Sequence, residues 1–353
     1  MLGEELFIEL SLGSALQVVM LGFIGGMLSG FIGSGGAFFM TPGMMNLGVP
    51  GVVAVGSNIT HKFGKALVGS KKHGEMGNVD KLLGMCMLVT ASAGISIAAF
   101  LNSHFFKSAE GSAGGDLYIS VIFISFLSIV SVSMLSDVWR AAPGEGPSLK
   151  IAEICSRIRL WPMIHFKVAD VRVSLWVIMP IGLATGFLAG TIGVGGFIGV
   201  PAMIYVLGIP TAVAAGTELY LAVFMGAWGC LNYAWNGYVD LRLTLLLYVG
   251  SLVGIHLGAY GTKVVKEVYI RLVTGVIILL CVVSRLIATP EYLRRLGYID
   301  IDPRHDIWWD YTSKTILFAS GIVGALAILW TVGRAYVHRR RLRASLFVAQ
   351  SGE

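Results

Sequence analysis

Charged side chains are scarce in this chain of 353 residues. Asp, Glu, Lys and Arg make up 13% of the sequence, against about 25% in soluble domains. Apolar residues make up 56%, and the mean hydropathy is +0.78. A water-soluble fold would not hide so much apolar surface, so the composition excludes a soluble protein and predicts an integral membrane protein. Several apolar runs of about 20 residues are long enough to cross the hydrocarbon core as helices.

Cysteine is scarce as well, with four in the chain and no CxxC or Cys/His spacing. Neither a metal site nor a disulfide framework is therefore expected, and the sequence calls for no cofactor. The predicted spans contain no Ser/His pair, HExxH motif or paired-Asp motif. An intramembrane enzyme is for this reason the weakest reading of the chain.

The formal net charge is +6. The basic residues lie mostly in loops and at the C-terminal end, which is how polytopic membrane proteins set their orientation. We therefore expect a lipid bilayer and a small anionic substrate as partners, and no nucleic acid. The oligomeric state is open, with a homodimer as one option.

Two glycine-rich stretches, Gly22–Pro50 and Gly182–Pro210, lie 160 residues apart and match each other. At a constant offset of 160, the matched core positions are Gly30, Ile32, Gly33, Gly35 and Gly36 against Gly190, Ile192, Gly193, Gly195 and Gly196. The match continues through Asp80 and Asp240, which we interpret as helix N-caps. Duplicated halves with interrupted apolar segments are typical of membrane transporters, and the interruptions mark the binding site.

Each glycine-rich stretch interrupts an apolar run that is too long for one crossing. Residues 12–47, as one unbroken helix, would span about 54 Å at 1.5 Å per residue. We therefore expect broken or re-entrant segments. The predicted fold is an all-α polytopic membrane protein with two homologous, inverted helical repeats and an extra C-terminal transmembrane helix. The expected boundaries are 1–137 and 173–288 for the repeats, 138–172 for a basic linker, and 289–353 for an outer loop, the final helix and a basic tail.

The charges predict the topology. If each broken segment crosses an even number of times, the basic tail, the linker and Lys71–Lys72 all lie on the cytoplasmic side. The N-terminus and a loop bearing Trp308, Trp309 and Tyr311 then lie outside, and each half has an odd number of crossings, so the halves are inverted. The apolar residues of the linker recur near helical spacing, which predicts a short helix lying on the membrane surface.

The glycine-rich breaks are candidates for anion binding. A broken helix exposes N–H groups at the start of its next half, where an anion is stabilised. The candidate residues are Gly33, Ser34, Gly35 and Gly36 in the first half and Gly193, Gly195 and Gly196 in the second. The alternative is that these glycines only allow close helix packing, which is the reading we adopt for Gly22, Gly26 and Gly30 and their counterparts.

A second candidate group lies in the span that follows the first break. Asn58, His61 and Lys62 share one helical face at membrane depth, where a lysine usually faces a polar cavity or a partner. Ser57 precedes them, and Lys65 extends the face toward the membrane interface. The alternatives are lysine snorkelling and a structural ion pair.

The matching span of the second half reads Thr217-Glu218, with no lysine. We expect Thr217 in the binding site, and Glu218 either pairs with a cation such as Lys62 or takes part in a proton relay. His61 is a second candidate for proton coupling. No residue is expected to bind a metal or to act catalytically.

The doubled pattern GxxGxxxGxIGxGG…P…LGxP…AxG[ST] resembles the TauE/SafE family over residues 15–137 and 174–288. The resemblance implies a multi-pass inner-membrane permease for sulfite or an organosulfonate. It carries over the motif residues Gly33, Gly35, Gly36, Pro42, Gly56 and Ser57, with Gly193, Gly195, Gly196, Pro201, Gly216 and Thr217. It does not carry over His61, Lys62 or Glu218.

The sequence thus predicts a secondary transporter that moves a small anion by alternating access. The resemblance points to sulfite or an organosulfonate as that anion, and proton coupling is an addition to this hypothesis. An importer and a passive anion channel are the alternatives.

Overall fold

The computed structural model describes residues 7–32, 36–108, 112–140, 150–156, 160–193, 195–265 and 267–350. The first half contains α1 (Leu12–Ile32), α2 (Ala37–Asn46), α3 (Gly51–Glu75), α4 (Lys81–Ser108) and α5 (Ala113–Arg140). The second half contains α7 (Leu175–Ile192), α8 (Gly196–Tyr205), α9 (Thr211–Trp235), α10 (Leu241–Val264) and α11 (Glu267–Arg295). Among the described residues, eight helices are long and apolar enough to cross a membrane. The predicted helical membrane fold is confirmed.

Both glycine-rich segments are broken, as predicted, and both are re-entrant. In the first, α2 folds back along α1, so that Gly43 packs against Leu21. In the second, α8 folds back along α7, and Gly199 packs near Thr185. Gly193 ends α7 with a φ of 79°, a left-handed conformation that glycine adopts without strain.

Glycines hold the two halves together by letting helices from different halves approach closely. A Cβ added at Gly22 would lie 2.5 Å from the carbonyl oxygen of Leu247, so α1 touches the backbone of α10. In the same way a Cβ at Gly182 would lie 2.6 Å from the carbonyl oxygen of Met87, where α7 meets α4. This is the small-residue packing predicted for these positions.

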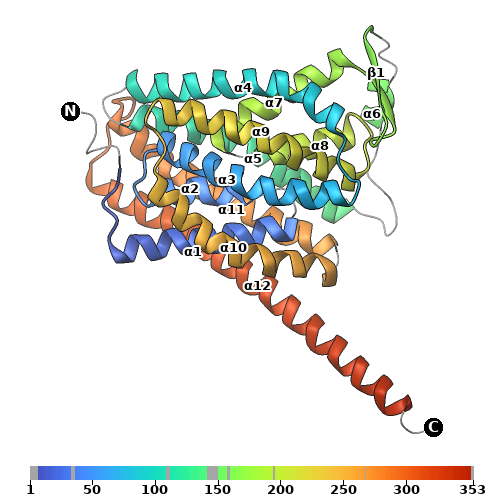
Figure 1. Ribbon diagram of the computed structural model, residues 1–353. Helices are drawn as coiled ribbons and strands as arrows, with labels where there is room; N and C mark the ends of the chain where they lie inside the picture. Colours follow the sequence, from blue (N-terminus) through green and yellow to red (C-terminus); the bar gives the residue numbers. More distant parts are fainter. Residues whose placement is uncertain are drawn as a thin grey trace.

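The direction of the packed helices follows from the order of their contacts. Gly22, Gly26 and Gly30 meet Leu247, Ser251 and Ile255 in that order, so α1 and α10 run parallel. The counterpart helices α3 and α9 run antiparallel, because Gly226 meets Phe63 and Gly229 meets Ile59. Figure 1 shows helices of the two halves interleaved side by side.

The linker contains a short helix, as predicted, and also a hairpin that the sequence did not predict. Its described part has only a short helix, α6 (Lys150–Ser156), followed by an antiparallel hairpin of β1 (Met163–Phe166) and β2 (Val171–Ser174). The side chain of Phe166 is fully buried in a cluster formed by α4 and helices of the second half. The hairpin therefore adds two short strands to the predicted all-α fold.

The two predicted aspartate caps are confirmed, and one of them also fastens the linker. Asp240 Oδ1 accepts from the backbone N–H groups of Arg242 and Leu243 at the start of α10. Asp80 Oδ1 accepts from Leu83 N at the start of α4, and its Oδ2 accepts from the turn of the hairpin, at Val168 N and Ala169 N.

The extra C-terminal helix α12 (Arg304–Gln350) is longer than predicted. It includes Trp308, Trp309 and Tyr311, so the prediction of a loop at these residues is wrong. At 47 residues it is about 70 Å long, so it extends well beyond the other helices (Figure 1). Its distal part and the linker hairpin lie toward one end of the molecule, and the chain's N-terminal side lies toward the other.

The close helix contacts give a stability prediction. Gly186→Ala places a methyl group against the backbone of Ala91, with the Cα of Ala91 only 2.6 Å away, and we expect a loss of about 1–3 kcal/mol from overpacking. Gly74→Ala is the control, because a Cβ there meets nothing within 4 Å. Thermal unfolding in detergent measures both. An unfolding temperature for Gly186→Ala equal to that of Gly74→Ala would contradict the proposed packing.

Candidate functional site

A cavity of about 390 Å³ lies between α1, α3 and α10 and reaches both helix breaks. Of the predicted site residues, the cavity is lined by Asn58, His61, Lys62, Gly193, Gly195 and Gly196. Gly33, Ser34 and Gly35 lie outside the described residues. Gly36 is packed against the backbone of Gly25 and is not part of the cavity wall. The cavity extends along α3 to His73 and the exposed Lys72, so its mouth lies at the end of α3.

Asn58 connects the two breaks. Its Nδ2 donates to Thr41 Oγ1 at 2.7 Å and to the carbonyl oxygen of Ala37 at 3.3 Å, both in α2. Thr41 Oγ1 in turn donates to the carbonyl oxygen of Ile192, at the end of α7. A Cβ added at Gly193 would lie 3.1 Å from Asn58 Nδ2. The fully buried amide therefore fixes the distance between the two re-entrant segments.

Lys62 and Glu218 form the predicted pair, but a loose one. Lys62 Nζ lies 3.8 Å from Glu218 Oε1, whereas a hydrogen-bonded ion pair has its atoms about 2.7–2.9 Å apart. Within the described residues, Lys62 Nζ and both carboxylate oxygens of Glu218 are buried without a hydrogen-bond partner. A Cβ at Gly195 would lie 3.0 Å from Lys62 Nζ. The ammonium group is thus placed beside the second break with its donors unused.

Two further side chains of α3 line the cavity. His61 Nε2 is 2.7 Å from Ser251 Oγ of α10, and its ring lies 4.7 Å from the ring of Tyr248. Lys65 Nζ donates to Ser29 Oγ of α1. Lys65 therefore joins Lys62 in the same cavity. The described residues contain no group of three His, Cys, Asp or Glu side chains that could hold a metal ion.

Ser57 and Thr217 lie outside the cavity lining and connect the halves in a reciprocal way. Ser57 Oγ accepts from Asp240 N at 3.0 Å, and Thr217 Oγ1 accepts from Asp80 N at 3.0 Å. Both hydroxyl groups are fully buried. A hydroxyl of each repeat thus holds the aspartate that begins a helix of the other repeat: Ser57 holds Asp240 before α10, and Thr217 holds Asp80 before α4.

Sequence reasoning did not single out several residues of this region. Thr41, Ser29, Ser251 and Tyr248 reach the site only because α2 folds back and α1 packs on α10. Arg285 is different, because a charged residue inside an apolar span is a functional signal that the sequence already contained.

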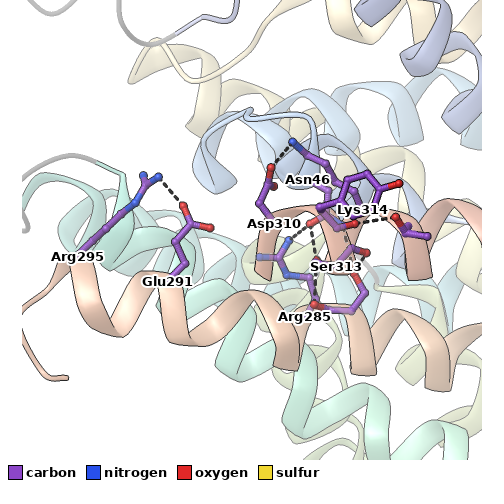
Figure 2. Close-up of polar contacts among 10 residues, drawn as sticks. Asn46, Arg285, Glu291, Arg295, Asp310, Ser313 and Lys314 are labelled. Carbon is purple, nitrogen blue, oxygen red and sulfur yellow. Dashed lines mark hydrogen bonds and ion pairs between the residues drawn. The ribbon is translucent and has the colours of Figure 1, made fainter. Parts of the chain in front are cut away.

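Arg285 is fully buried in α11 and holds α2 in place. Its Nη1 donates to Asn46 Oδ1 at 2.7 Å, and its Nη2 donates to Tyr292 Oη at 2.5 Å. Asn46, the last residue of α2, also bonds to Ser284 of α11 and accepts from Ser313 of α12. Figure 2 shows Asn46, Arg285 and Ser313 converging from these three helices. The extra helix α12 thus helps to bury α2 along its whole length.

This cluster gives a second stability prediction. Asn46→Ala removes an acceptor from a fully buried guanidinium, and we expect a loss of about 1.5–3 kcal/mol. The matched control is Asn236→Ala, because Asn236 is exposed and its side chain donates to the carbonyl oxygen of nearby Asn232. Thermal unfolding compares the two variants. A change of the same size in both would show that the cluster does not hold α2.

Comparison with known proteins places this site in a transporter family. The family model described as "Sulfite exporter TauE/SafE" matches residues 18–285. The chain is 24% identical over 260 residues to the probable membrane transporter protein YdhB of Bacillus subtilis, covering 72% of this chain and 94% of that protein. It is 24% identical over 262 residues to the probable membrane transporter protein YjnA of the same organism, covering 70% and 89%.

A probable membrane transporter protein of Xylella fastidiosa is also 24% identical, over 72% of this chain and 85% of that protein. No solved structure matches the chain. The family match covers both glycine-rich breaks and α3, with its cationic face. The chain therefore belongs to the TauE/SafE family and is a multi-pass membrane transporter.

Proposed function

We propose that this transporter moves a small sulfur-containing anion, sulfite or an organosulfonate, by alternating access across the inner membrane. The observation that carries this proposal is the ammonium group of Lys62, buried in a cavity at the second helix break and only loosely paired with Glu218. An ammonium at membrane depth needs an acceptor. The substrate anion supplies it.

The charge of the cavity favours an anion. Lys62 and Lys65 both line the cavity, and Lys72 lies at its mouth. Glu218 Oε1 lies 3.8 Å from Lys62 Nζ. With the lysines protonated and the glutamate ionised, the inner part of the site carries one net positive charge. A cavity of this sign with low-dielectric walls raises the local concentration of anions.

The two re-entrant helices add backbone donors. α2 and α8 both begin after a glycine N-cap with no side-chain hydrogen bond. Ala37 and Gly196, the first residues of these helices, line the cavity. Uncapped N–H groups at a helix start attract an anion. The volume of about 390 Å³ falls in the range of about 300–1,000 Å³ for small-molecule sites.

Much of the cavity lining is apolar, with Met40, Leu252 and Ile255 among its residues. Such a wall suits the carbon part of an organosulfonate, while the lysines and the helix starts suit the sulfonate group. Sulfite would occupy the same polar end.

Alternating access follows from the arrangement of the halves. The antiparallel packing of α3 on its counterpart α9 supports inverted repeats, which exchange their conformations when the site changes sides. The cavity reaches the end of α3 that lies near the linker hairpin, since Asp80 joins the following helix to that hairpin. With the basic segments and the C-terminus cytoplasmic, this conformation is open to the cytoplasm. Import and export remain alternatives, because gradients set the direction.

Lys62 also offers a route to proton coupling. Its ammonium group lies next to both the cavity and Glu218. An anion that draws Lys62 away leaves the Glu218 carboxylate unpaired in a buried position, where it is stabilised by taking up a proton. The anion and the proton would then move together.

A ligand screen tests the proposal. We expect sulfite or sulfoacetate, at about 100 times the dissociation constant, to stabilise the protein by about 2.7 kcal/mol, which raises the unfolding temperature by several degrees. Thiosulfate and sulfate complete the set. Lys62→Ala should abolish the rise, and the exposed Lys71→Ala should retain it. An equal rise in all three proteins would remove Lys62 from the site.

A further inference from the structure

His73 and Tyr233 are equivalent residues of the two repeats. They stand at an offset of 160, two residues before the ends of α3 and α9. Their packing is equivalent too. A Cβ added at Gly56 would lie 3.1 Å from Tyr233 Cβ, and a Cβ at Gly216, its counterpart, would lie 3.2 Å from His73 Cβ. The two side chains therefore occupy the same place in opposite halves.

Tyr233 closes the side of the site away from the cavity mouth. Its hydroxyl donates to the carbonyl oxygen of Gly190 at 2.7 Å. Asn102 Nδ2 donates to Tyr233 Oη at 2.6 Å and to the carbonyl oxygen of Thr191 at 3.1 Å. Both side chains are 0–1% exposed. The last turn of α7 is thus tied to α9 and α4, and this side is packed shut.

His73 has no such bond in this conformation. It is half-buried and lines the mouth of the cavity, and its Nδ1 has no hydrogen-bond partner within the described residues. The counterpart of Gly190 in the first half is Gly30, near the end of α1. Gly30 lines the same cavity. The pair that is joined on the closed side is therefore separated by the cavity on the open side.

We propose that His73 is the gate on the cytoplasmic side: when the cavity closes there, a ring N–H of His73 donates to the carbonyl oxygen of Gly30, as Tyr233 now does to Gly190. The proposal rests on the alternating access proposed above. In the state that is open to the other side, the hydrogen bond from Tyr233 to Gly190 is broken, and Tyr233 is then the residue without a partner, as His73 is now. Neither residue contacts the substrate. Together they determine from which side of the membrane a solute can reach Lys62.

The test follows the accessibility of the cavity without any substrate. Ala66 lines the cavity on α3, between Lys62 and His73. Ala66→Cys is introduced into a full-length protein whose four cysteines (Cys86, Cys155, Cys230 and Cys281) are replaced by alanine or serine. A membrane-impermeant maleimide is applied to sealed vesicles of each orientation, and the labelling rate is measured from each side.

His73→Tyr gives the inner gate the hydroxyl that the outer gate has, and Gly216 leaves room for the ring as Gly56 does for Tyr233. We expect labelling from the linker side to be about fivefold slower in His73→Tyr than in His73→Phe, because the phenyl ring cannot make the one hydrogen bond to Gly30 that closes this side, and we expect labelling from the other side to be faster. His73→Phe, which has the ring without the hydroxyl, is the matched control, and it should be labelled faster from the linker side than the wild-type protein because it lacks the donor. Tyr233→Phe should raise labelling from the side opposite the linker.

Equal labelling rates for His73→Tyr and His73→Phe on both sides would overturn the proposal. So would an unchanged rate on the far side in Tyr233→Phe. Because the readout needs no anion, it separates the gate from the proposed function. A gate that responds as described in a protein that no sulfur anion stabilises would leave the gate standing and remove the substrate.

Discussion

A helix that breaks inside a bilayer leaves backbone groups that water cannot reach, and each of them needs a partner. This constraint shapes the centre of the protein. The carbonyl groups at the end of α7 are satisfied by side chains from three other helices, namely Tyr233, Asn102 and Thr41. The amide groups at the starts of α2 and α8 have glycine caps without side-chain acceptors. The carbonyl groups at the end of α7 thus have side-chain donors, whereas the N–H groups at the starts of α2 and α8 have no side-chain acceptor from their caps and lie beside a cationic cavity.

The same centre depends on helices that approach one another more closely than ordinary side chains allow. Glycines on α1 and α7 bring these helices against the backbones of α10 and α4, so each repeat packs mainly on the other. Ser57 and Thr217 add a matched pair of hydrogen bonds across the same boundary. The repeats nevertheless differ where the site needs them to differ. The lysines that line the cavity lie on α3, whereas the α9 face has Glu218 instead. The helix α12, with Arg285, buries the first re-entrant helix.

Much of the fold could be predicted from the sequence, because glycine breaks, apolar runs and the 160-residue offset are local patterns. The pairing of Lys62 with Glu218 was also predictable, since two opposite charges at membrane depth need each other. The roles of Ser57 and Thr217 were not, because a hydroxyl beside a break suits a ligand as well as a backbone N–H. The partner of each is 183 or 137 residues away.

The linker hairpin shows a second limit of sequence reasoning. Asp80 accepts hydrogen bonds from Val168 N and Ala169 N in its turn, and Phe166 is buried among residues of α4 and the second half. Strands this short depend on such tertiary contacts, which a local sequence pattern does not reveal. Thr41 was missed for a related reason. It belongs to a helix whose return path along α1 is set by packing, and only that path brings it to Asn58.

The central claim is that an anion binds between Lys62 and the start of α8. The most direct measurement is the position of selenite, the heavier analogue of sulfite, from anomalous scattering in crystals of the full chain. The account predicts selenium in the cavity, with its oxygens hydrogen-bonded to Lys62 Nζ and to backbone N–H groups near Gly196, and with Lys62 moved away from Glu218. Selenium bound only outside this cavity, with the Lys62–Glu218 pair unchanged, would contradict it.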